Sequence, residues 1–149
     1  MSRFWSIGVS ILAWIGVWAF WLTATHAFHP TFVLALIVTT TLVSAYAIAA
    51  YVNHLVLIPQ FWIPGQWWRY SVLLAITMTF LAASALAVIR VSYLQLHGPD
   101  ADPNGVYKHY AIDLFGMVVH VGMAGLVVAM VRRFTASHRR NLSEQAADD

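Results

Sequence analysis

The chain contains no cysteine among its 149 residues. This absence excludes disulfide bonds, thiolate metal sites and cysteine nucleophiles, although it leaves the cellular compartment undecided. Charged residues are also scarce, at 9% of the chain, whereas hydrophobic residues make up 60%. A soluble domain needs more polar surface than this composition supplies. The sequence therefore predicts a protein embedded in a lipid bilayer.

Long apolar runs occupy most of the chain. A helix needs about 20 apolar residues to cross a hydrocarbon core that is roughly 30 Å thick. The sequence predicts an all-α integral membrane four-helix bundle with short loops, in which residues 1–135 form one transmembrane domain and residues 136–149 form a short, polar cytoplasmic tail. The predicted spans cover residues 4–25, 31–57, 67–96 and 111–131.

The connections between the runs contain residues that interrupt helices. Pro30 separates the first two runs, because proline disfavours a helical conformation in the residue before it. Pro59, Pro64 and Gly65 lie where the second run has reached membrane length, and we interpret them as the turn that ends the second span. The aromatic residues around this turn are typical of a membrane interface: Trp62, Trp67, Trp68 and Tyr70.

The cations predict the orientation of the chain, because Lys and Arg favour the cytoplasmic side of a membrane. Arg3, Arg69 and the arginines of the C-terminal tail fall on one side of a four-span topology. We therefore expect a multi-pass protein of the bacterial inner membrane with both termini in the cytoplasm. A cleaved signal peptide is the alternative for the first run, because Thr25, His26 and Ala27 loosely resemble a cleavage site. The length of the run and its four tryptophans fit a retained span better.

Small residues recur on one face of the third run and on one face of the fourth. Lipid gives no hydrophobic drive to helix association, so small side chains that let backbones approach favour packing between helices. We expect both faces to pack inside the bundle. Their residues are Ala75, Thr79, Ala83 and Ala87 in the third run, and Gly122, Gly125 and Ala129 in the fourth.

Two ionisable residues lie within predicted spans. Arg90 follows Arg69 by 21 positions and Asp113 precedes Arg132 by 19, so helix rise places both near the outer leaflet. A charge within a bilayer is costly unless it finds a partner or water, and we predict an ion pair between Arg90 and Asp113. Such a pair fixes the register of two helices. A ligand-responsive or proton-responsive element and snorkelling to the headgroups are the alternatives.

Three polar residues of the second and fourth runs are predicted to lie in the bundle interior: Asn53, His54 and His120. Their side chains can hydrogen-bond to neighbouring helices. A haem held by His54 and His120 is disfavoured, because its two axial ligands must lie at similar depth. His54 lies about one turn from the inner end of its span and His120 lies twelve residues before Arg132, which is a mismatch of about 12 Å by helix rise. We expect no cofactor.

The third connection contains the opening D-x-D-x-N-G of a calcium-binding loop. The twelfth position of that loop is Ala111 and not the bidentate glutamate that calcium requires. We interpret the segment as a turn and expect no metal, with a weak calcium site as the alternative. Its oxygen-bearing residues are Asp100, Asp102 and Asn104.

Residues 51–61 have the pattern Y-x-N-H-x-x-L-I-P-x-F, and Trp68-x-Tyr70 and a new apolar run follow. This pattern resembles the end of the second span in the membrane region of LytS/YehU-like bacterial sensor histidine kinases. The resemblance implies a four-span module that takes part in signal transduction. In that family the last span leads to a phosphoacceptor histidine and an ATP-binding domain. His138 lacks the matching context and no glycine-rich ATP lid follows, so the resemblance implies the membrane module without its kinase domain.

Catalytic arrangements are not evident in the sequence, which contains no nucleophile beside a base, no carboxylate pair and no phosphate-binding glycine loop. We therefore expect no enzyme, and predict a non-catalytic membrane module for sensing, anchoring or scaffolding. A small accessory or structural subunit of a respiratory or photosynthetic complex is the alternative. A carrier is a weaker third class, because no internal repeat is present. The expected partners are the lipid bilayer and other membrane proteins or further copies of the chain, and no nucleic acid.

Overall fold

The computed structural model describes residues 3–97, 111–128 and 130. Within these ranges the chain forms helices joined by short turns, without a β-strand. A fourth long helix, Ala111–Val128, follows the third. The preceding elements are α1 (Arg3–Thr25), the short 3₁₀ helix η1 (His26–Phe28), α2 (Phe32–Val52), the π-helical segment η2 (Asn53–Trp62) and α3 (Trp67–His97).

Among the described residues, four helical segments are long and apolar enough to cross a membrane. The π-helical segment η2 continues α2 without a break, so the second of these segments is longer than α2 alone. This result confirms the predicted all-α class and the number of candidate spans. The segments are Gly8–Phe28, Phe32–Trp62, Trp67–Leu96 and Ala111–Val128.

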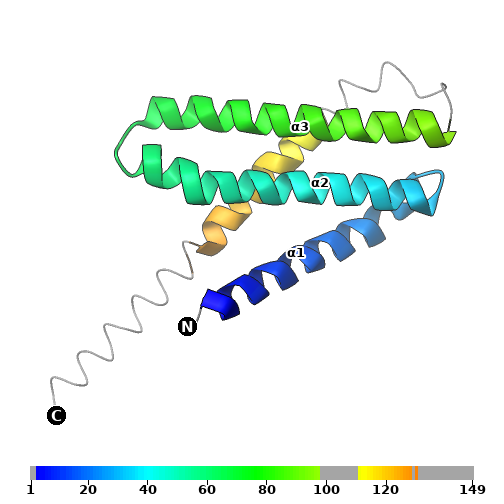
Figure 1. Ribbon diagram of the computed structural model, residues 1–149, viewed down its shortest axis with the longest axis horizontal. Helices are drawn as coiled ribbons and strands as arrows, with labels where there is room; N and C mark the ends of the chain where they lie inside the picture. Colours follow the sequence, from blue (N-terminus) through cyan, green and yellow to red (C-terminus); the bar gives the residue numbers. More distant parts are fainter. Residues whose placement is uncertain (1–2, 98–110, 129, 131–149) are drawn as a thin grey trace, which may run out of the picture.

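The second helix, α2, lies at the centre of the arrangement. It runs antiparallel to α3, and the two helices lie side by side over most of their length (Figure 1). On another side it contacts α1, whose N-terminal part diverges from it (Figure 1). The fourth helix, coloured yellow to orange, crosses α2 and α3 obliquely (Figure 1) and packs against both through Met117 and Val121. Each of the other helices therefore meets α2.

Small side chains allow α2 and α3 to approach closely. Ala49 is 1% exposed and Ala82 is 0% exposed, and both belong to one buried cluster with Ala45 and Ala85. Alanine has no atom beyond Cβ, so the backbones of the two helices meet with few side-chain atoms between them. This contact fixes which face of α3 is turned inward.

The small-residue faces lie elsewhere than predicted. The side chains of Ala75, Thr79, Ala83 and Ala87 are exposed, because α3 turns the neighbouring face with Ala82 toward α2. In the fourth helix Gly122 is exposed and Gly125 is half-buried, and no atom lies within 4 Å of a Cβ built on either. The prediction that these faces pack inside the bundle is wrong for the described residues of one chain. Ala129 lies outside the described residues.

The end of the second span also differs from the prediction. Pro59 lies inside η2, and the helix continues to Trp62. In an α-helix the proline ring clashes with the carbonyl group of residue i−4, whereas π-helical bonds join residues five apart and widen the turn. The Ile63 amide accordingly donates to the Ile58 carbonyl at 3.0 Å. Pro64 and Gly65 form the turn into α3, where Gly65 has a φ of 79° that favours glycine.

Candidate functional site

Three helices meet around His120 of the fourth helix. The Trp21 indole nitrogen of α1 donates to His120 Nε2 at 3.1 Å. His120 Nδ1 lies 2.7 Å from the carbonyl oxygen of Gly116, one turn earlier in the same helix. The Tyr46 ring of α2 stacks on the imidazole, with 4.5 Å between the ring centroids. We name Trp21, Tyr46, Gly116 and His120 the His120 cluster.

The two hydrogen bonds assign the protons of His120. A carbonyl oxygen can only accept, so Nδ1 carries a hydrogen and donates it to Gly116. An indole nitrogen can only donate, so Nε2 carries no hydrogen and accepts from Trp21. The imidazole is therefore neutral, and both nitrogens are hydrogen-bonded. This arrangement leaves no free lone pair on His120 for a metal ion.

Gly116 makes room for Tyr46, whose side chain is only 5% exposed. A Cβ built on Gly116 would lie 2.7 Å from the Tyr46 hydroxyl oxygen and 3.3 Å from its Cζ. Real side chains do not approach that closely, so a larger residue would force the tyrosine or the fourth helix to move. The contact between α2 and the fourth helix thus depends on a glycine at this position.

Asp113 and Arg90 lie in different environments. Asp113 is half-buried on the fourth helix, two turns before His120, and interacts electrostatically with Tyr46. Arg90 is exposed on α3. An exposed guanidinium near the end of a span can reach the headgroups, as in the snorkelling alternative. The ion pair between the two residues stays a prediction.

Asn53 takes part in a second contact, between η2 and α3. Its side chain is 6% exposed, and its Oδ1 accepts a hydrogen bond from the Tyr70 hydroxyl at 2.9 Å. Trp62 lies against Tyr70 with 5.0 Å between the ring centroids. His54 is half-buried in η2. The predicted polar interior residues therefore occupy different contacts, with Asn53 at the turn into α3 and His120 at the crossing of α1, α2 and the fourth helix.

A third contact joins the first connection to α3. His29 Nδ1 and the Tyr93 hydroxyl oxygen lie 2.6 Å apart. Burial lowers the pKa of His29 from its ordinary value of 6.5, because desolvation disfavours the charged imidazolium. Burial therefore favours the neutral form of His29. No sequence pattern pointed to this pair, since its residues are 64 positions apart.

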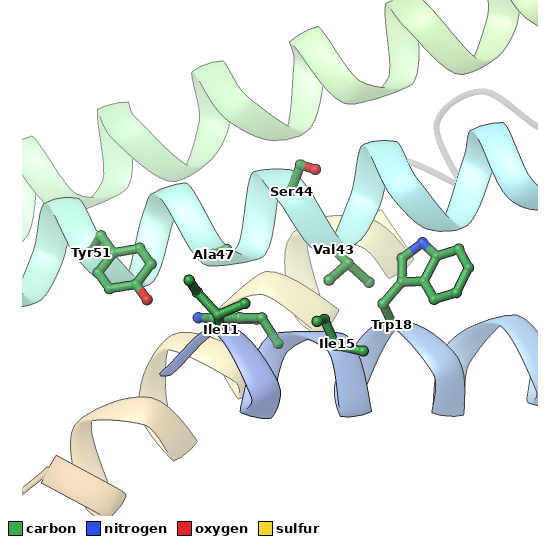
Figure 2. A pocket seen from close by; sticks show the side chains of 8 residues that line it. Ile11, Ile15, Trp18, Val43, Ser44, Ala47 and Tyr51 are labelled. Atoms are coloured by element: carbon green, nitrogen blue, oxygen red, sulfur yellow. The ribbon is translucent and has the colours of Figure 1, made fainter. Parts of the chain in front are cut away.

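An apolar groove of about 340 Å³ lies between α1 and α2 (Figure 2). Two hydrogen bonds flank it, one between Ser10 and Tyr51 and one from the Trp18 indole to the Thr40 hydroxyl. The lining contains no carboxylate, histidine or lysine that could act as a general acid or base. Its residues are Ile11, Trp14, Ile15, Trp18, Val43, Ser44, Ala47 and Tyr51.

The remaining candidate residues belong to the third connection and the C-terminal tail. Asp100, Asp102 and Asn104 of the calcium-like turn lie outside the described residues, as does His138. Within the described ranges, no three His, Cys, Asp or Glu side chains come together in a way that could hold a metal ion.

Comparisons with protein-family models, with curated proteins and with solved structures found no match to this chain. The resemblance to the membrane region of sensor histidine kinases therefore depends on the sequence pattern of residues 51–61.

Proposed function

We propose that the chain is a non-catalytic integral membrane module that acts through other membrane proteins, in sensing, anchoring or scaffolding. The observation that carries this proposal is the exposed small-residue face of α3. Close packing of backbones favours helix association in lipid, and small side chains allow it. A second transmembrane helix is the partner that such a face accommodates. The face consists of Ala75, Thr79, Ala83 and Ala87.

The polar side chains of the described helices support a non-catalytic role. Trp21 bonds to His120, Trp18 to Thr40 and Tyr70 to Asn53, and each bond joins two helices or helical segments. None of these pairs combines a nucleophile with a base that could activate it. Their polar groups are used to hold helices together.

Two more specific roles are each supported by a separate observation. A sensory role like that of the LytS/YehU-like kinases is supported by the pattern of residues 51–61. A role as an accessory subunit of a respiratory or photosynthetic complex is supported by large apolar side chains that face outward, such as Phe80 at 69% and Phe115 at 70% exposure. In a bilayer lipid contacts such side chains, and in a larger assembly protein or pigment would replace that lipid.

The proposal is tested by enlarging one residue of the α3 face. Ala83→Leu adds bulk to this face, whereas Ser84→Leu adds a leucine at the next position, which is also exposed but lies about 100° around the helix. We expect Ala83→Leu to lower the recovery of co-purifying membrane proteins about tenfold, which corresponds to ~1.4 kcal/mol of lost affinity. Quantitative mass spectrometry of the chain purified from native membranes in mild detergent measures this recovery.

Equal recovery from the Ala83→Leu and Ser84→Leu variants would contradict the use of this face. The identity of the proteins separates the two specific roles. Signalling proteins among them would support a sensory role, and electron-transfer proteins would support an accessory subunit. An absorption spectrum of the same preparation reports any bound pigment.

We further propose that the chain lies in a bacterial inner membrane with both termini in the cytoplasm. This orientation is supported by Arg3 near the N-terminus, by Arg69 after the second span and by the arginines after the fourth. Reporter fusions at Asp149 and at Asn104 are expected to be active on opposite sides of the membrane. Activity of both fusions on one side would refute the four-span topology.

A further inference from the structure

We propose that the His120 cluster is a proton-responsive contact, in which a proton on His120 Nε2 releases Trp21 and lets α1 move away from the fourth helix. This inference does not depend on the function proposed above, because it concerns the position of one helix within the chain. It follows from the directions of the hydrogen bonds, from the groups around His120 and from the exposure of α1.

The hydrogen-bond directions make the contact specific for the neutral imidazole. Nδ1 donates to Gly116 and Nε2 accepts from Trp21, so both polar atoms of the ring are used. A proton that adds to Nε2 occupies the lone pair that accepts the Trp21 bond. The indole nitrogen cannot accept in return, so two N–H groups then point at each other. The 3.1 Å contact becomes repulsive, and its two partners must separate.

The groups around His120 can accommodate the positive charge of a protonated imidazole on every side except that of α1. On α2, the face of the Tyr46 ring stacks on the imidazole, and aromatic faces attract cations. On the fourth helix, Asp113 lies seven residues earlier, about 10 Å along the helix axis, and its carboxyl interacts electrostatically with Tyr46. On α1, Trp21 presents its N–H to the ring. The α3 side chains in the adjoining buried cluster are not ionisable: Met78, Ala82 and Ala85.

The first helix, α1, also has the smallest share of buried side chains among the four candidate spans. No side chain of its candidate span, Gly8–Phe28, is buried, whereas 44% of the corresponding window of Phe32–Trp62 is buried. Its N-terminal part already diverges from α2 (Figure 1). The Trp18–Thr40 and Ser10–Tyr51 bonds still join α1 to α2. Loss of the Trp21 bond therefore frees the C-terminal part of α1, around Trp21, and leaves the contact between α2 and α3 in place.

The absence of cysteine from the chain permits a direct test. Cysteines introduced at Ala24 of α1, close to Trp21, and at Leu126 of the fourth helix, which are both exposed, carry spin labels without disturbing the core. We expect electron–electron double resonance in lipid nanodiscs to give one distance at pH 8 and an added, longer distance at pH 5, reversibly. A control pair at Ile48 of α2 and Phe80 of α3 should give the same distance at both pH values.

Two variants connect the movement to the His120 cluster. His120→Gln replaces the imidazole with an amide that stays neutral and whose oxygen can accept from Trp21, so the longer distance should not form. Trp21→Phe keeps an aromatic ring without an N–H, so protonation no longer produces a repulsive contact and the pH response should disappear. Circular dichroism at both pH values verifies that each variant remains helical.

Three results would overturn the proposal. The first is an unchanged distance in the unsubstituted pair between pH 8 and pH 5. The second is the same pH response in His120→Gln, which would assign the movement to another group, such as His29 in its contact with Tyr93. The third is a ¹⁵N spectrum of labelled histidine at pH 8 that places the His120 hydrogen on Nε2.

Discussion

Replacing Ala82 with leucine is expected to lower the free energy of unfolding by about 1 to 3 kcal/mol, the usual effect of extra carbons in a well-packed core. Ala82 is 0% exposed and shares a buried cluster with Ala45 and Ala49 of α2. A leucine adds three carbons where the two backbones meet over alanines. The helices must separate, or the new side chain must leave its preferred rotamer. Thermal unfolding in detergent, followed by circular dichroism, measures the loss.

Ala83→Leu is the matched control for this prediction. It introduces the same side chain at the neighbouring position, which is exposed. An exposed substitution of this kind changes stability by within about 0.5 kcal/mol. An equal loss for the two variants would show that the inward face of α3 has been assigned incorrectly.

Gly116→Ala is expected to destabilise the crossing of α2 and the fourth helix, again by about 1 to 3 kcal/mol. The new Cβ would lie 2.7 Å from the Tyr46 hydroxyl oxygen. A tyrosine on the surface could swing away, but Tyr46 is buried and stacked on His120. Removing the hydroxyl should restore part of the stability, so we expect the double variant with Tyr46→Phe to unfold at a higher temperature than Gly116→Ala alone.

Gly122→Ala provides the comparison on the same helix. No atom lies within 4 Å of a Cβ built on Gly122, so the added methyl group meets no obstacle. Alanine favours a helix over glycine by about 1 kcal/mol, and we expect no loss of stability. A loss as large as that of Gly116→Ala would mean that the effect comes from the helix itself and not from contact with Tyr46.

The all-helical class and the four candidate spans could be predicted from the sequence, because spans are encoded in local composition. The face of α3 that packs against α2 could not be predicted from the sequence. Small residues recur at Ala75 and Ala83, and the neighbouring face holds Ala82 and Ala85. Spacing alone does not distinguish two adjacent stripes of small residues, since the choice depends on the shape of α2.

The candidate site was predictable only in part, for a related reason. His120 could be recognised as a polar residue within a span. Its partner Trp21 is 99 positions away. Tryptophan is common in membrane proteins for other reasons, such as contact with the interface, so its residue type did not identify it as the partner. Pro59 was expected to end its helix because proline usually does so. The π-helical geometry that accommodates it depends on backbone bonds that no residue type specifies.

The distance along the chain between Trp21 and His120 also constrains the order of assembly during synthesis. The α2–α3 hairpin is joined by a short turn, so its contacts can form as soon as the third span has entered the membrane. Contacts between residues close in sequence form early because little chain entropy is lost. The bond between Trp21 and His120 spans 99 positions and can form only after the fourth helix has been made. Until then α1 lacks its partner in the fourth helix and is held by its contacts with α2, which include the bond from Trp18 to Thr40.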